Sequence, residues 1–226
     1  MGPDKRLLAI GATTWNGIGE AIAESAPSRY GVSKPTPDEM DVTGYNHVKK
    51  FLEENGPYSH VVYCAGVQYL GKLDELDHTD IQTIFDVNVI GFINVLSALT
   101  RTQKSGRVCA ISSLAGRVPM TGSIGYCASK AALNHAVRCA ARELKENWQI
   151  TAIVPATVAD TPLTTSVDEQ VMAIRDWDRA ELEKQERIRQ PFGRRITKDE
   201  VADVVWATIT GPMTLTGSVI DLAGGA

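Results

Sequence analysis

The sequence predicts a doubly wound α/β fold, in which helices cover both faces of one twisted parallel sheet. Short apolar runs alternate along the chain with longer segments whose apolar residues recur at three- and four-residue steps, the patterns of buried strands and amphipathic helices. Strands separated by helices must pair in parallel, and right-handed crossovers then place helices on both faces. A length of 226 residues fits one such domain, so we expect a single domain over residues 1–226.

The first quarter of the chain is predicted as strand, helix, strand and helix, with one weak link. Residues 6–10 are an apolar run that ends in a glycine-rich turn, and a helix follows that turn. A brief second strand is expected at residues 30–32, but the prolines and glycines around it leave almost no room for a helix behind it. Thr43 can cap the next helix, which ends before Gly56.

The remainder of the chain continues the alternation until a polar stretch interrupts it. This stretch, residues 161–195, is expected to be a mobile lid, with an ordinary solvated surface helix as the alternative. Pro155 stops the strand that precedes it. The predicted strands are residues 60–65, 107–111, 149–154 and 218–222, and the predicted helices are residues 77–101, 125–148, 176–189 and 199–209.

Composition argues against several kinds of partner. The net charge of -4 lacks the basic excess of nucleic-acid-binding proteins, so we expect no nucleic acid. No uninterrupted apolar run approaches the roughly 20 residues that span a bilayer, and residues 1–6 do not resemble a signal peptide. We therefore expect a cytoplasmic protein without membrane contact. The cysteine spacings predict neither a disulfide nor a metal site.

Three glycines lie where the first strand turns into the first helix. Gly11, Gly17 and Gly19 occupy the place where the pyrophosphate of a dinucleotide approaches the backbone and the N-terminus of a helix. The alternative is a glycine turn that serves tight packing alone.

A second group of residues points to acid-base chemistry. Tyr126 and Lys130 are four apart on a predicted helix, so both project from one face, and an ammonium group there would favour the ionised phenol. The same spacing also occurs on ordinary amphipathic surfaces. Ser113 ends the preceding strand at the carboxyl edge of the sheet, where ligands of this fold class bind. Asn88 is a polar residue inside an apolar helix, either locally satisfied or functional.

With these residues assembled, the sequence resembles the short-chain dehydrogenase/reductase family, whose fold is Rossmann-like, over essentially its whole length. The resemblance rests on motifs that follow one another in the family's order. They are the glycine turn from Gly11 to Gly19, Asp41-Val42, Tyr63-Cys64-Ala65-Gly66 in place of the family's Asn-Asn-Ala-Gly, Asn88, Ser113, Tyr126-Cys127-Ala128-Ser129-Lys130, Pro155 and a closing segment from Leu215 to Gly225.

The resemblance implies an NAD(P)-dependent oxidoreductase that moves hydride between nicotinamide and a carbonyl or alcohol carbon. Tyr126 would be the general acid or base, and Ser113 would position the substrate oxygen. Lys130 would hold the nicotinamide ribose and lower the pKa of Tyr126, while Asn88 would keep a water that links Lys130 to solvent. The other implied cofactor contacts are Gly11, Thr13, Gly17, Ile18, Gly19, Ala65, Gly66, Pro155 and Val158, with Asp41 and Val42 beside the adenine ring.

The chain departs from the family's pattern in the cofactor half of the site. Five residues separate Gly11 from Gly17 where the family usually has three, so this loop should bulge around Trp15. Tyr63 and Cys64 replace two asparagines that normally brace the neighbouring turns. These departures leave the four catalytic positions untouched.

The choice of cofactor depends on the end of the second strand. An NAD site would place Asp or Glu there for the ribose 2′-hydroxyl, whereas this strand leads into Ser33 and Lys34, which suit a 2′-phosphate. We therefore expect NADP(H) rather than NAD(H), unless Lys34 is simply solvated.

Two other functions remain open at this point: a non-catalytic module that senses NADP(H) or binds a protein, and a non-redox dehydratase or epimerase on the same fold. The family resemblance also implies a homodimer or homotetramer through the two long helices, with a small carbonyl or alcohol compound as substrate.

Overall fold

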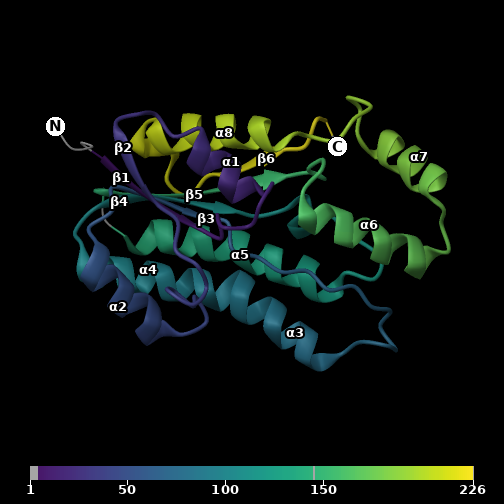
Figure 1. Ribbon diagram of the computed structural model, residues 1–226, viewed down its shortest axis with the longest axis horizontal. Helices are drawn as coiled ribbons and strands as arrows, with labels where there is room; N and C mark the ends of the chain where they lie inside the picture. The colour runs from purple at the N-terminus through teal and green to yellow at the C-terminus, as the bar shows by residue number, and fades with distance from the viewer. Residues whose placement is uncertain (1–4, 145, 226) are drawn as a thin grey trace.

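The computed structural model describes residues 5–144 and 146–225, which form a parallel sheet between two layers of helices (Figure 1). The six strands of this part of the chain lie in the order β2-β1-β3-β4-β5-β6, and all neighbours are parallel. The predicted fold class is confirmed. The strands are β1 (Lys5–Ile10), β2 (Tyr30–Ser33), β3 (His60–Tyr63), β4 (Gly106–Ile111), β5 (Trp148–Pro155) and β6 (Val219–Leu222).

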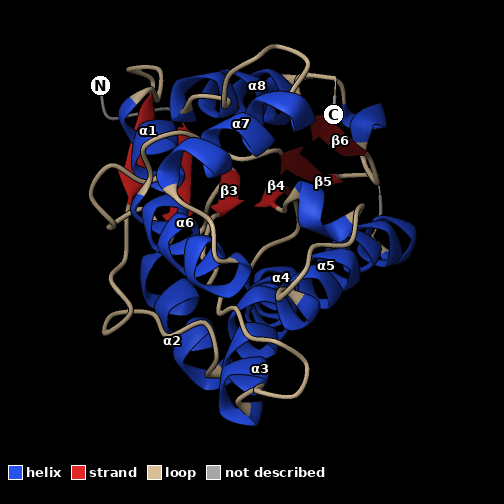
Figure 2. Cartoon of the chain, turned by 90° about the vertical axis from the view of Figure 1, so that its right-hand side faces the viewer, coloured by secondary structure: helices blue, strands red, loops and turns tan. Residues whose placement is uncertain are grey.

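The central strands β3, β4 and β5 are almost entirely buried because helices cover both faces of the sheet there. In β1, Leu8 and Ile10 point into one buried cluster and Leu7 and Ala9 into the other, as the two-residue period of a strand requires. The first cluster packs against α2, α4 and α5, and the second against α1 and α8 (Figure 2). The helices are α1 (Ile18–Glu24), α2 (Tyr45–Asn55), α3 (His78–Phe85), α4 (Gly91–Thr102), α5 (Ile124–Glu143), α6 (Pro162–Arg175), α7 (Arg179–Arg189) and α8 (Lys198–Thr210).

The sheet order places a crevice between β1 and β3. The chain leaves β1 for α1 on one face and leaves β3 for α3 and α4 on the other, and ligands of doubly wound folds bind outside the carboxyl ends of such strands. The helices α6 and α7 extend beyond this same edge (Figure 1). Residues 34–44 contain no helix, which confirms the predicted gap after the second strand.

Two predicted boundaries were wrong for local reasons. The helix predicted to reach Trp148 ends at Glu143, because Trp148 begins β5 and pairs with Gly106 of β4. Thr43 does not cap α2, whose N-cap is Gly44, because the Thr43 hydroxyl donates instead to the Asp41 carboxylate at 2.8 Å.

The long apolar helix predicted at residues 77–101 is interrupted by a π-helical turn. This turn, Asp86–Ile90, lies between α3 and α4 and has Asn88 at its centre. The whole segment His78–Thr102 is as long and apolar as a membrane-spanning helix, and half of its most apolar window is buried inside the protein. A core helix of an α/β protein has the same composition.

Candidate active site

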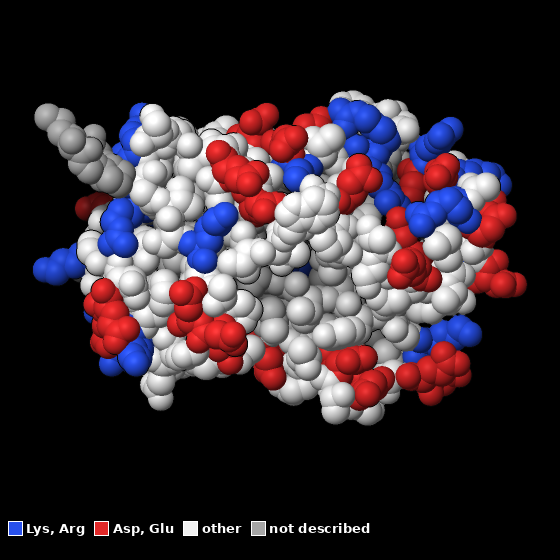
Figure 3. Space-filling model, viewed as in Figure 1, with Lys and Arg blue, Asp and Glu red and all other residues white. Residues whose placement is uncertain are grey.

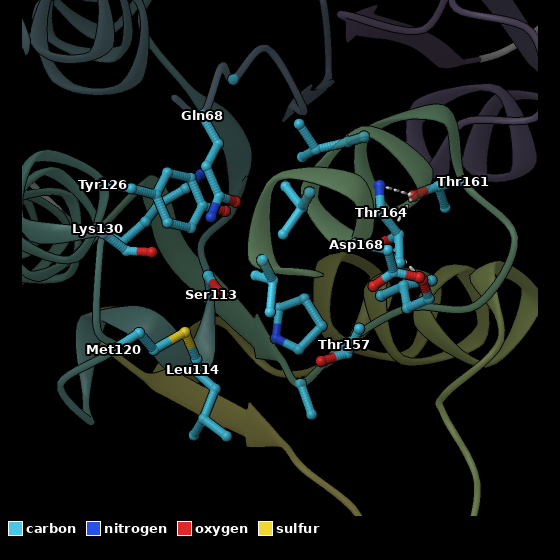
Figure 4. Close-up of a pocket in the computed structure, with 18 of the residues that line it drawn as sticks. Gln68, Ser113, Leu114, Met120, Tyr126, Lys130, Thr157, Thr161, Thr164 and Asp168 are labelled. Atoms are coloured by element: carbon cyan, nitrogen blue, oxygen red, sulfur yellow. Dashed lines mark hydrogen bonds between the residues drawn. The ribbon is translucent and has the colours of Figure 1, made fainter. Parts of the chain in front are cut away.

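A cavity of about 550 Å³ opens at the carboxyl edge of the sheet and runs from the glycine turn to the lid helices. Figure 3 shows the face of the molecule in which it is hollowed out. Figure 4 shows Gln68, Ser113, Tyr126 and Lys130 together on one side of it, while Thr161 and Asp168 come from the opposite side. The cavity therefore brings the predicted catalytic residues and the segment predicted as a lid to one place.

The glycine turn makes two approaches that only glycine allows. Gly11 has φ +76°, and a Cβ there would lie 2.6 Å from the Ala65 nitrogen. A Cβ on Gly19 would lie 2.6 Å from the Gly11 carbonyl oxygen. Packing alone accounts for these approaches, but Gly11, Gly17 and Gly19 also line the cavity, as a cofactor site would require.

The lengthened glycine turn carries an exposed tryptophan and an asparagine that contacts distant parts of the chain. Trp15 is 80% exposed, and Asn16 takes the left-handed φ of +59°. The Asn16 side-chain amide donates to the carbonyl of Asp160, and its oxygen accepts from Lys198 Nζ. These partners lie just before and just after the predicted lid, so the glycine turn is tied to both ends of that segment.

Tyr126 and Lys130 project from the first two turns of α5 and are both buried. Lys130 Nζ donates to the carbonyl of Ile111 at 3.0 Å and lies 5.5 Å from the centre of the Tyr126 ring. Burial lowers the pKa of Lys130 to about 8, partly offset by the nearby Cys64 thiol.

The expected lowering of the Tyr126 pKa is not found in the protein by itself. Burial raises the pKa of Tyr126 to about 12, and the hydrogen bond with Ser113 opposes this only in part. The expectation considered the charge of Lys130 and omitted the loss of water around the phenol. Ser113 itself is the N-cap of a short 3-10 helix (Leu114–Gly116), and its hydroxyl accepts from the Ala115 N–H at 3.2 Å.

Asn88 is fully buried behind the cavity wall. Its Oδ1 accepts from the Val67 N–H at 2.9 Å, and its Nδ2 donates to the Val67 carbonyl and the Ser129 hydroxyl, both at 3.0 Å. Of the two readings of this residue, local satisfaction is thus observed. Asn88 is also close to Lys130, because a Cβ on Gly66 would lie 3.4 Å from Asn88 Oδ1 and 3.5 Å from Lys130 Nζ.

The predicted residues divide between the cavity and a more distant region. The four residues that the sequence analysis placed toward the adenine and 2′-phosphate of the cofactor do not line the cavity. Ser33 accepts from the Tyr58 hydroxyl at 3.2 Å, Lys34 is exposed, the Asp41 carboxylate accepts from Thr43, and Val42 is buried. The predicted residues that line the cavity are Gly11, Gly17, Ile18, Gly19, Gly66, Ser113, Tyr126, Lys130, Pro155 and Val158, whereas Thr13, Ala65 and Asn88 lie outside its lining.

The lid contains a helix that the sequence reasoning missed. Residues 176–189 were expected to be helical, and α7 confirms this from Arg179 onward. The preceding α6 was not predicted, although Thr161 followed by Pro162 is a typical helix start. The side of α6 that faces the cavity supplies part of its lining. Lining residues that sequence reasoning did not single out are Gln68, Met120, Leu163, Val167, Asp168, Val171 and Leu182.

A network of ion pairs holds α6 and α7 to the segment behind them. Asp168 of α6 is buried, and both of its carboxylate oxygens accept from Arg195 at 2.8 Å. Arg179 approaches the same carboxylate at 3.3 Å, and Arg195 also contacts Glu186 at 3.3 Å. Figure 3 shows both signs of charge close together at this end of the molecule.

Comparison with known proteins agrees with this geometry. The sequence profile described as short chain dehydrogenase matches residues 32–172. L-xylulose reductase of Caenorhabditis elegans is 27% identical over an alignment of length 251, which covers 98% of this chain and 95% of that protein. The 3-ketodihydrosphingosine reductase of Bos taurus is 31% identical over 121 residues, 52% of this chain but only 36% of that reductase, so the match spans about a third of its length.

Solved structures give the same fold over almost the whole chain. The ligand-free aldohexose dehydrogenase of Thermoplasma acidophilum superposes with a TM-score of 0.83 at 25% identity, over 98% of this chain and 93% of that one. A small-chain dehydrogenase in complex with NADPH superposes with a TM-score of 0.84 at 21% identity, over 98% of this chain and 97% of that one. The second likeness concerns the fold alone.

Proposed function

Because the chain belongs to the short-chain dehydrogenase family, we propose that it is an NADP(H)-dependent oxidoreductase that interconverts a carbonyl and an alcohol with Tyr126 as the proton-transfer residue. The observation that carries the proposal is the convergence of Ser113, Tyr126 and Lys130 on one cavity that the glycine turn also lines. Named relatives of the chain are reductases and dehydrogenases, which agrees with this class of reaction.

Tyr126 is suited to act as an acid in the direction of reduction. With a pKa near 12 its phenol stays protonated at neutral pH, yet a phenol is a stronger acid than an aliphatic alcohol. It can therefore donate its proton to a carbonyl oxygen as that oxygen gains negative charge. The Ser113 hydroxyl would donate a hydrogen bond to the same oxygen and hold it beside the phenol. The bound cofactor would supply the hydride to the carbon.

Lys130 and Asn88 would support this proton transfer from behind. The lowered pKa of Lys130, about 8, makes its ammonium group able to exchange a proton near neutral pH. We propose that Lys130 binds the nicotinamide ribose hydroxyls and that Tyr126 regains its proton through Lys130. The proximity of Asn88 to Lys130 supports a water-mediated link between them.

The residues fit a dinucleotide because the cavity floor lacks side chains where the backbone must approach it. Gly11, Gly19 and Gly66 line the cavity with backbone alone, from the first turn toward Lys130. NADP(H) is proposed over NAD(H) because Lys34 is exposed just beyond β2 and next to the Ser33 hydroxyl, where a 2′-phosphate could be neutralised.

The first experiment is a titration of the protein with NADPH and NADH, followed by nicotinamide fluorescence, and then a panel of ketones, aldehydes and quinones with the tighter binder. We expect the protein to bind NADPH more tightly than NADH, and we expect Lys34→Ala to lose this preference. Lys50→Ala, at an exposed position of α2, is the control. Equal binding of both cofactors would remove the NADP assignment alone. Binding of neither would remove the oxidoreductase proposal.

The cytoplasmic location, the single domain and the homo-oligomeric assembly stay predictions from the sequence. Size-exclusion chromatography with light scattering would test the assembly directly.

A further inference from the structure

Tyr63 occupies the position of the first asparagine in the family's Asn-Asn-Ala-Gly motif, and it is fully buried at the end of β3. Its ring packs edge-on against Phe92, with ring centres 5.6 Å apart. Its hydroxyl donates to the carbonyl of Val87 at 2.5 Å. Burial, with a smaller contribution from Asp41, raises the pKa of Tyr63, so the hydroxyl remains a donor.

The accepting carbonyl belongs to the π-helical turn around Asn88. In an α-helix the Gly91 N–H would donate to the Val87 carbonyl, four residues back. Here the Gly91 N–H donates to Asp86 instead, which leaves the Val87 carbonyl without its helical donor. The Tyr63 hydroxyl supplies a partner to this carbonyl, which is partly buried. A fully buried carbonyl without a partner would cost about 1–3 kcal/mol.

Gly91 is the complementary residue that makes room for this hydroxyl. A Cβ at position 91 would overlap Tyr63 Oη and would lie 2.8 Å from Val42 Cγ2. Tyr63 can therefore reach the helix backbone only because residue 91 has no side chain. The hydroxyl, the π turn and the glycine form one packing unit.

This unit sets the position of Asn88. The side-chain amide of Asn88 holds both the N–H and the carbonyl of Val67, in the loop directly after the motif that contains Tyr63. It also holds Ser129, which is adjacent to Lys130 on α5. If the π turn relaxed to α-helical geometry, the side chains on it would rotate and Asn88 would lose this register.

We propose that Tyr63 is a positioning residue, whose hydroxyl stabilises the π turn and thereby holds Asn88 against Val67 and Ser129. The inference rests on the proposed function, in which Asn88 serves the proton path through Lys130. It assigns the support of Asn88 to a side chain that the family's motif does not supply at this position.

The test measures hydrogen exchange of the Val67 amide, whose proton is held by Asn88 and by no strand or helix ladder. In Tyr63→Phe this amide is expected to exchange about ten-fold faster, the factor that loss of one hydrogen bond produces. Tyr30→Phe is the matched control. Tyr30 is another buried tyrosine, it lies on β2 rather than β3, and its hydroxyl contacts the side chain of His60. In this control the Val67 amide is expected to exchange as in the unmodified protein.

A second variant approaches the same contact from the other side. Gly91→Ala keeps the hydroxyl but displaces it, so Val67 is expected to exchange faster there as well. This variant decides the question should Tyr63→Phe not fold. In the unmodified protein, the Tyr63 hydroxyl proton is expected as a slowly exchanging NMR signal.

Three results would overturn the proposal: unchanged exchange of Val67 in Tyr63→Phe, equal acceleration in Tyr30→Phe, or rapid exchange of the Tyr63 hydroxyl proton. A turnover assay adds an independent reading, in which Tyr63→Phe lowers kcat about ten-fold and leaves KM nearly unchanged. Absence of turnover in the unmodified protein would count against the proposed function, while the exchange data would still decide the role of Tyr63.

Discussion

The two sides of the cavity are built by different means. The sheet side, which we define as Asn88, Ser113, Tyr126 and Lys130, is mostly buried. Its members other than Tyr126 make hydrogen bonds to backbone groups. The lid side, which we define as Asn16, Asp160 and residues 161–195, is held largely by side-chain bridges between charged groups and amides. Backbone partners surrounded by core resist displacement, whereas side-chain bridges can be released without loss of the sheet, even where one partner, such as Asp168, is buried.

The contrast suits the two sides to different tasks: proton transfer on the sheet side and entry and release of ligands on the lid side. A proton-transfer group needs a fixed position and a fixed environment, which the sheet side supplies through α5 and β4. A substrate must enter and leave, which requires a wall that can open without loss of the core. We therefore expect variants on the sheet side to change turnover, and variants on the lid side to change opening and cofactor exchange.

The largest effect is expected from Tyr126→Phe. Removal of the phenolic hydroxyl should lower turnover by about 10²–10⁴-fold, the usual contribution of a general acid, and should leave NADPH affinity nearly unchanged because the ring remains. Steady-state kinetics and the fluorescence titration measure the two quantities. Tyr69→Phe, at a 40% exposed tyrosine outside the cavity lining, is the control. Substantial turnover in Tyr126→Phe would contradict the assigned role.

The exclusion of water from Lys130 can be measured through the pH dependence of the free energy of unfolding. Burial lowers the Lys130 pKa to about 8 in the folded protein, against 10.5 for a free lysine. Between these values the unfolded chain binds more protons, so the free energy of unfolding rises with pH from about 8 to 10.5. The rise should reach roughly 3 kcal/mol at most and should be absent in Lys130→Met. Parallel stability curves for the two proteins would show that Lys130 is hydrated.

On the lid side, the strongest bridge is the carboxylate of Asp168. Asp168→Asn removes the charge opposite Arg195, and because this arginine is partly exposed we expect a loss of about 2 kcal/mol, less than for a fully buried pair. The loss should appear as faster hydrogen exchange in α6 and α7, with the sheet unchanged. Glu200→Gln, which weakens the exposed Arg194–Glu200 pair, is the control and should leave hydrogen exchange in α6 and α7 unchanged. Equal loosening of the sheet would contradict a separate lid.

The same contrast explains what could be predicted from the sequence. Gly11 and Gly19, Ser113, and Tyr126 with Lys130 lie in short motifs, so local spacing was sufficient to bring them to one edge of the sheet. The pKa of Tyr126 was predicted in the wrong direction, because burial depends on the whole fold. The π turn escaped notice since apolar spacing continues through it. The helix α6 was missed because it lies in a stretch that is polar as a whole and because its packing depends on distant Arg195.

The smallest expected effect concerns the bridge made by Asn16, whose partners lie 144 and 182 residues away in the sequence. Loss of the Asn16 side chain should speed NADPH dissociation about three- to ten-fold. Each of its hydrogen bonds contributes about 1 kcal/mol to the stability of the ordered glycine turn. Asn16→Gly is the better variant, since glycine keeps the left-handed φ while Asn16→Ala adds backbone strain. Stopped-flow fluorescence would measure the rate, with exposed Trp15 as a neighbouring reporter. If Asn16→Gly released NADPH at the original rate while Asp168→Asn still loosened the lid, the lid side would consist of two independent parts.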